Sequence, residues 1–329
     1  MISRLSQLAR HLSATTPRPA LGYIPAATSL SGSRSSGLAS RIMASVEERN
    51  ARTIHTAACL IIGDEVLGGK TNSAYLAKWC FSLGINLKRV EVIEDDEAEI
   101  IEAVRRMSDR YDLVVTSGGI GPTHDDITYQ SIAKAFGLDL VLHEEAYERM
   151  KKLSKPKKLE PGFSWDVESP AKTARLRMVR LPIDPSRDLA KQALFPRKTL
   201  WVPISVVNGN IHILPGVPKL FESLLEGLKP FIVDRLVDPD GKGICRVIIS
   251  TPMPESSVAE YLTELAARVE PKGVKVGSYP RWGKKNNSVT LVGRDAGYLE
   301  SLVPEVIENV QGKRVFVEGE DDDEPNVVT

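Results

Sequence analysis

Short apolar runs alternate with amphipathic segments between residues 56 and 142, and this alternation constrains the fold more than any other feature. The apolar runs predict β-strands, and the segments between them predict helices that end at glycines or before the next strand. The expected strands are 56–63, 86–95, 111–117 and 139–142, and the expected helices are 71–84, 97–110 and 127–137. Such alternation predicts βαβ units with right-handed crossovers, and therefore an α/β fold with a mostly parallel sheet covered by helices. Further strands are expected at 174–182, 200–207 and 210–216, before a helix over 219–236.

A different order of elements follows residue 243. The pattern there predicts strand, helix, strand, strand, helix and strand, which is the βαββαβ order of a small α+β, ferredoxin-like domain. The polar segment 237–243 (VDPDGKG) is the expected linker. We therefore predict one domain over 55–237, a second over 244–319 and a solvated acidic tail over 320–329.

Composition excludes several functional classes. Acidic and basic residues balance at 43 each, whereas a nucleic-acid-binding domain is expected to carry a basic surface. The apolar runs are too short to span a membrane. The three cysteines, Cys59, Cys80 and Cys245, lie far apart, which predicts reduced, buried thiols rather than a disulfide framework or a zinc site.

The first 46 residues differ in composition from the rest of the chain. They are rich in serine and arginine and contain no aspartate or glutamate. These features predict a mitochondrial presequence, and a disordered N-terminal tail is the alternative. A start at Met43 would yield a cytosolic form.

The segment 116–126 (TSGGIGPTHDD) follows the strand expected at 111–117. Ligands of parallel sheets bind outside the carboxyl ends of the strands, and backbone N–H groups of glycine turns bind anions there. The loop, together with the later turn 215–218 (PGVP), predicts a site for a phosphate-bearing small molecule. The expected phosphate-binding residues are Ser117, Gly118, Gly119, Gly121, Thr123 and Gly216.

Acidic residues follow two of the predicted strands. Asp64 comes directly after the first strand, and Asp125 and Asp126 close the glycine loop. Carboxylates of this kind bind Mg²⁺ together with substrate phosphates, so these three acids are candidate ligands of a divalent metal. Asp64 and Asp126 are also the candidate catalytic residues. Alternatively, Asp126 caps the helix expected at Ile127.

Three segments carry a resemblance to a known family: 61–77 (IIGDEVLGGKTNSAYLA), 112–128 (DLVVTSGGIGPTHDDIT) and 213–218 (ILPGVP). They resemble the MoaB/Mog molybdopterin-binding domain family. Within it, the chain is most similar to the CinA-like branch and to the N-terminal domain of eukaryotic FAD synthase. The segments 191–196 (KQALFP) and 277–283 (GSYPRWG) support this narrower match.

The resemblance implies a three-layer α/β sandwich, a homo-oligomer and a glycine loop that holds phosphate. It places Asp64 and Asp126 where Mog-type proteins have acids that serve Mg²⁺ and chemistry. In the CinA-like branch this site implies metal-dependent cleavage of a pyrophosphate, as in FAD or ADP-ribose. The alternatives are molybdopterin or nucleotide binding with adenylyl transfer in molybdenum cofactor synthesis, and a non-catalytic nucleotide-binding module. The chain leaves no room for the FAD synthase transferase domain or the CinA deamidase domain, so we do not expect it to synthesise FAD.

Overall fold

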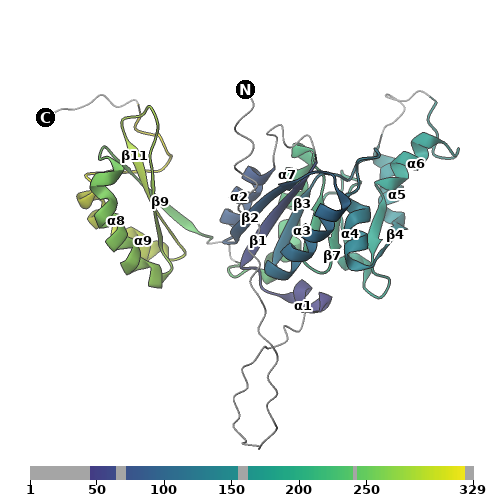
Figure 1. Ribbon diagram of the computed structural model, residues 1–329, viewed down its shortest axis with the longest axis horizontal. Helices are drawn as coiled ribbons and strands as arrows, with labels where there is room; N and C mark the ends of the chain where they lie inside the picture. Colours follow the sequence, from purple (N-terminus) through teal and green to yellow (C-terminus); the bar gives the residue numbers. More distant parts are fainter. Residues whose placement is uncertain (1–44, 64–71, 155–161, 240–242, 323–329) are drawn as a thin grey trace, which may run out of the picture. The chain divides into compact units, whose positions relative to one another are not determined.

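The computed structural model describes residues 45–63, 72–154, 162–239 and 243–322 (Figure 1). Asp64 and almost all of the predicted presequence lie outside the described residues. None of the described helices is long and apolar enough to cross a membrane.

A six-stranded sheet forms the centre of the first part of the chain. Four neighbouring strands run parallel, and the last two strands are antiparallel. The prediction of a mostly parallel sheet is therefore confirmed. In spatial order the strands are β2 (Asn86–Ile93), β1 (Thr56–Ile62), β3 (Leu113–Ser117), β8 (Ile211–Leu214), β7 (Ile204–Val207) and β6 (Ala193–Leu194).

Helices cover both faces of this sheet and complete a three-layer sandwich (Figure 1). One face packs against α2 (Ser73–Ser82) and α7 (Pro218–Ile232), and the other against α3 (Glu97–Arg110) and α4 (Thr128–Phe136). Successive side chains of β1 enter opposite cores, because strand side chains alternate between faces. A strand buried on both sides is expected to be apolar, and β1 is apolar after Thr56.

A two-stranded antiparallel sheet lies outside the main sheet. It pairs β4 (Asp139–Leu142) with β5 (Arg180–Ile183), and α5 (Glu144–Leu153) and α6 (Pro170–Arg177) lie between them in sequence. The side chains of β4 are largely exposed, which suits a short peripheral strand.

The prediction of a strand over 174–182 is wrong for its first half, because the structure has the end of α6 there. Ser169 accepts a hydrogen bond from the backbone N–H of Lys172, and Pro170 occupies the first turn. Both features favour helix initiation, so the helix extends into the apolar run.

The folded region begins earlier than the sequence predicts. Helix α1 (Val46–Ala51) precedes His55 and begins with a capping box between Ser45 and Glu48. Arg49 is buried and forms a 2.8 Å ion pair with Asp109 at the end of α3. These contacts make α1 part of the sandwich, although its sequence is polar and its length is marginal for an isolated helix.

Two cysteines lie in the main core. Cys59 on β1 and Cys80 on α2 are fully buried, and burial raises the pKa of each thiol to about 12. Cys245 is half-buried, and none of the three forms a disulfide. The prediction of burial is confirmed for Cys59 and Cys80.

The C-terminal part forms a four-stranded antiparallel sheet with its own core, which confirms the small α+β fold. The strand order is β10-β11-β9-β12, the arrangement of a split βαβ fold. In sequence order the elements are β9 (Cys245–Thr251), α8 (Glu255–Val269), β10 (Lys275–Tyr279), β11 (Asn287–Gly293), α9 (Ala296–Asn309) and β12 (Lys313–Val315).

Two acids near the start of the acidic tail, Asp321 and Asp322, are not solvated as predicted, although Glu320 is exposed. Both carboxylate oxygens of Asp322 accept hydrogen bonds from the guanidinium of Arg281 at 2.6 Å, and Lys284 lies 3.0 Å away. The hydrogen bonds from Arg281 lower the pKa of Asp322 to about 2. Asp321 is buried beside it, so at least two of these acids belong to the folded C-terminal part.

Candidate functional site

The glycine loop after β3 packs tightly against the ends of two neighbouring strands. Gly118 has a φ of +109°, and a Cβ there would lie 2.1 Å from the carbonyl oxygen of Ile62 at the end of β1. A Cβ on Gly216, after β8, would lie 3.2 Å from the Cα of Gly118. Only glycine fits such an approach at Gly118. The loops after β3 and β8 therefore meet at the carboxyl edge of the sheet, as the sequence predicts.

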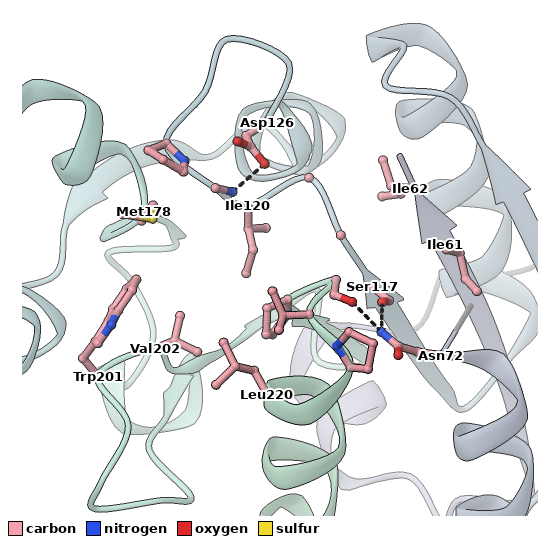
Figure 2. Close-up of a pocket in the computed structure, with 18 residues that line it drawn as sticks. Ile61, Ile62, Asn72, Ser117, Ile120, Asp126, Met178, Trp201, Val202 and Leu220 are labelled. Carbon is pink, nitrogen blue, oxygen red and sulfur yellow. Dashed lines mark hydrogen bonds between the residues drawn. The ribbon is translucent and has the colours of Figure 1, made fainter. Parts of the chain in front are cut away.

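Asn72 connects these loops. Its side-chain amide donates to the hydroxyl of Ser117 at 2.9 Å and to the carbonyl of Gly216 at 3.0 Å (Figure 2). Asn72 occupies the N-cap position of α2, but its side chain makes no capping bond. Sequence reasoning missed this positioning role, because asparagine before a helix is typical of a cap.

Asp126 closes the glycine loop on itself. One carboxylate oxygen accepts the backbone N–H of Gly121 at 2.6 Å, and the other accepts the backbone N–H of Thr123 at 2.9 Å and its hydroxyl. Asp126 does not cap α4, whose N-cap is Ile127 without a side-chain bond. The capping alternative is therefore wrong, and the carboxylate organises the loop instead.

The same bonds change which loop amides can bind an anion. The backbone N–H of Gly118 donates to Leu214 at 3.2 Å, and that of Gly121 donates to Asp126. Both were expected to face a phosphate. Among the described residues, no atom accepts a hydrogen bond from the N–H groups of Gly119 and Ile120. These two amides are therefore among the loop donors that a ligand could engage.

A cavity of about 470 Å³ opens between these loops and the start of α7. Most of its wall is apolar, with Ile120, Met178, Trp201, Val202 and Leu220 around the space (Figure 2). Asp126 lies at its rim, and Ser117 and Asn72 bound the opposite side. The arrangement suits a planar ring with an attached anionic group, because ligand pockets are mostly apolar with a few placed polar groups.

The other predicted acids are placed differently. The Asp125 side chain is 59% exposed, and its interaction with the Thr123 side chain lowers its pKa. His124 is almost fully exposed, with its Nδ1 atom 3.8 Å from Asp125. Asp64 lies outside the described residues, so the structure does not test its convergence with Asp126.

An acid that the sequence analysis overlooked lies close to the loop. Asp95 is half-buried and follows β2, and a Cβ on Gly119 would come within 3.2 Å of its Oδ1 atom. The signal for it was present, because Asp95 follows its strand as Asp64 follows β1. The strand predicted over 86–95 included Asp95, so Asp95 was not recognised as a residue that follows a strand.

The described residues hold no cluster of three His, Cys, Asp or Glu side chains suited to a metal. Mg²⁺ needs no such cluster, because it is usually bound by one or two carboxylates, substrate phosphates and waters. A carboxylate offers about four lone-pair positions, and Asp126 uses three of them within the loop. Asp126 therefore keeps one lone-pair position that a hard divalent cation could take, and Asp95 or Asp125 would have to supply a second carboxylate.

Comparisons with known proteins agree with this fold. Residues 58–234 match the family model "probable molybdopterin binding domain", and residues 244–318 match "FAD synthase, middle domain". A probable FAD synthase of Caenorhabditis elegans is 32% identical over 79% of this chain and 51% of its own length. A CinA-like protein of Anaeromyxobacter dehalogenans (strain 2CP-C) is 28% identical over 80% of this chain and 61% of its own length.

Among solved structures, the CinA protein of Thermoplasma acidophilum is 33% identical, with a TM-score of 0.43, and the match covers 56% of this chain and 99% of that one. The chain spans about half the length of the FAD synthase relative. The family model covers more than half of this chain. The chain therefore belongs to the probable molybdopterin-binding domain family, with similarity to CinA-like proteins and to FAD synthases.

Proposed function

We propose that this chain hydrolyses the pyrophosphate bond of a dinucleotide such as FAD or ADP-ribose, with a divalent cation. The observation that carries the proposal is the position of Asp126. Its carboxylate lies at the rim of an apolar cavity, on a loop with two unengaged backbone N–H groups. The apolar cavity suits a ring, the two N–H groups suit a phosphate and the carboxylate suits a cation. All three features lie at one edge of the sheet.

The cavity supports a nucleotide-sized ligand. Its volume of about 470 Å³ lies within the roughly 300–1,000 Å³ that is typical of small-molecule sites. Trp201 and Met178 offer apolar surface to a flavin, adenine or pterin ring. The N-terminal turn of α7 lines the same cavity through Val217, Pro218 and Leu220, and helix N-termini favour phosphate groups.

The acids at this edge would hold the cation. Asp126 contributes its remaining lone pair, and Asp95, Asp125 or Asp64 supplies a second carboxylate. When bound, a divalent cation supplies Lewis-acid charge at the phosphate oxygens. The chain itself fixes the loop through Asp126 and directs the N–H groups of Gly119 and Ile120 toward negative charge that develops on the attacked phosphate.

The reaction consumes one water molecule for each pyrophosphate. The water oxygen forms a bond to one phosphorus, the bridging P–O bond breaks and a proton is released. FAD would yield FMN and AMP, and ADP-ribose would yield ribose 5-phosphate and AMP. The similarity to FAD synthases and CinA-like proteins supports a nucleotide-processing role.

The experiment that tests this proposal is an assay of the purified full chain. FAD or ADP-ribose is incubated with the protein and Mg²⁺ or Mn²⁺, and the products are separated by chromatography. We expect AMP to form with at least one of the metals and not in the presence of EDTA. If AMP forms from neither substrate, the hydrolase proposal is wrong, and binding without turnover would then favour the molybdopterin or nucleotide-binding alternative.

A further inference from the structure

A second, smaller cavity lies beside the glycine loop. It has a volume of about 200 Å³ and shares Ile120, Gly121 and Asp126 with the apolar cavity. The rest of its wall differs in chemistry, because two arginines, Arg177 and Arg180, contribute to it. The loop that carries Asp126 is therefore bordered by an apolar cavity and by a basic one.

Both arginines come from the peripheral α6–β5 region. Arg177 ends α6, and its Nη2 atom donates to the carbonyl oxygen of Asp126 at 3.1 Å. Arg180 begins β5 and is exposed. Arg177 also lies close enough to Asp125 to lower the pKa of that carboxyl group. Guanidinium groups bind phosphate well, because they present several N–H donors in one plane.

Tyr129 provides a second, independent observation. It lies on α4, lines the same cavity and is only 5% exposed. Its hydroxyl is buried and has no hydrogen-bond partner among the described residues. Buried hydroxyls in folded proteins are almost always hydrogen-bonded. A ligand oxygen in the cavity would supply the partner that the protein does not.

We propose that this cavity, formed by Arg177, Arg180 and Tyr129, is a subsite for the phosphate of a nucleoside monophosphate. Its volume lies below the roughly 300 Å³ of ordinary ligand pockets, so it suits a single phosphate group better than a nucleotide ring. For its place in the reaction the inference rests on the proposed function: the subsite would hold one phosphate of the dinucleotide, and then of the product, while a ring lies in the apolar cavity.

The test is calorimetric titration of the full chain with AMP and with adenosine, which lacks the phosphate. The variants are Arg180→Gln, which changes an exposed side chain, and Tyr129→Phe, which keeps the ring and removes the hydroxyl. The matched control is Arg110→Gln. Arg110 is an exposed arginine at the end of α3, just before β3 begins and so at the opposite edge of the sheet.

We expect the wild type to bind AMP roughly tenfold more tightly than adenosine, which is the effect of one charge-assisted hydrogen bond. Arg180→Gln should remove most of that preference, and Tyr129→Phe should reduce it without lowering the unfolding temperature. Arg110→Gln should bind like the wild type. Equal affinity for AMP and adenosine, or wild-type AMP affinity in both Arg180→Gln and Tyr129→Phe, would overturn the inference.

This test is separable from the test of hydrolysis. If the wild type cleaves no dinucleotide but its preference for AMP depends on Arg180, the hydrolase proposal fails and the phosphate subsite stands. If cleavage occurs and the preference for AMP is the same in all variants, the subsite fails and the hydrolase proposal stands.

Discussion

Asp126 accepts a 2.6 Å hydrogen bond from the backbone N–H of Gly121, five residues earlier in the chain. With the second bond from Thr123, both carboxylate oxygens act as acceptors inside the loop. The residue thus has a structural role at the same place where the proposed function needs a negative charge. A substitution at Asp126 changes both, whereas one at the exposed Asp125 changes the charge alone.

Asp126→Asn is expected to abolish cleavage and to lower the free energy of unfolding. Asparagine would preserve a helix cap, but here its NH₂ group would face a backbone N–H, which costs about 1–3 kcal/mol for an unsatisfied pair. Asp125→Asn should change stability by less than about 0.5 kcal/mol, as exposed substitutions usually do. Urea unfolding of both variants checks this. Unchanged stability of Asp126→Asn would show that the loop closes without the carboxylate.

Gly118→Ala is expected to disrupt the site through backbone geometry. Its Cβ would lie 2.1 Å from the Ile62 carbonyl, and the residue would keep a φ of +109°. Gly137→Ala is the matched control, since Gly137 has a φ of +65° with open space around its Cβ position. The control should lower the free energy of unfolding by about 1–2 kcal/mol, the strain of a left-handed residue. Gly118→Ala should lower it by more. Equal thermal unfolding of the two variants would contradict the close packing of the loop.

Trp201 is expected to report ligand binding by fluorescence. It lines the apolar cavity, whereas Trp282 in the C-terminal part is fully exposed. Titration with FMN, corrected for flavin absorbance, should quench tryptophan emission in the wild type and in Trp282→Phe. The saturable part of the quenching should be lost in Trp201→Phe. Quenching that disappears with Trp282 instead would place the flavin away from the cavity.

His212 on β8 predicts a pH-dependent stability. Burial, with a smaller effect of Arg235, lowers the pKa of His212 to about 3, compared with about 6.5 in an unfolded chain. Between these values the unfolded state binds a proton that the folded state does not. The free energy of unfolding should therefore fall by about 2 kcal/mol from pH 7 to pH 5 through this group alone.

His212→Gln provides the comparison. Urea unfolding at pH 7 and pH 5 should show a smaller loss of stability in the variant than in the wild type, because glutamine does not titrate. The same pH dependence in both proteins would show that His212 is not kept neutral by the fold.

Local patterns were enough to predict the central sheet and the C-terminal α+β fold. The apolar run 56–63 has no alternative to a buried strand, and the helices 97–110 and 127–137 have clear amphipathic periods. The polar helix α1 was missed, because its stability comes from the burial of Arg49 against Asp109, a contact distant in sequence. The start of α6 was missed because the cap at Ser169 outweighed the apolar character of 174–182.

For the site, the sequence predicted the loops but not the direction of their hydrogen bonds. Aspartate before Ile127 and asparagine before Ser73 are both typical of helix caps, and in each case the side chain bonds to a loop instead. Trp201 and Tyr129 could not be assigned, since apolar and aromatic residues look alike in sequence whether they fill a core or line a cavity.

The most direct test of the central claim is the fate of the oxygen atom of water. FAD is incubated with the full chain and a divalent metal in water enriched in ¹⁸O, and AMP and FMN are analysed by mass spectrometry. Hydrolysis predicts one ¹⁸O atom in the phosphate of either AMP or FMN, with the two products in equal amounts. Failure to form AMP, or transfer of the adenylyl group to an added acceptor without incorporation of ¹⁸O, would contradict the account.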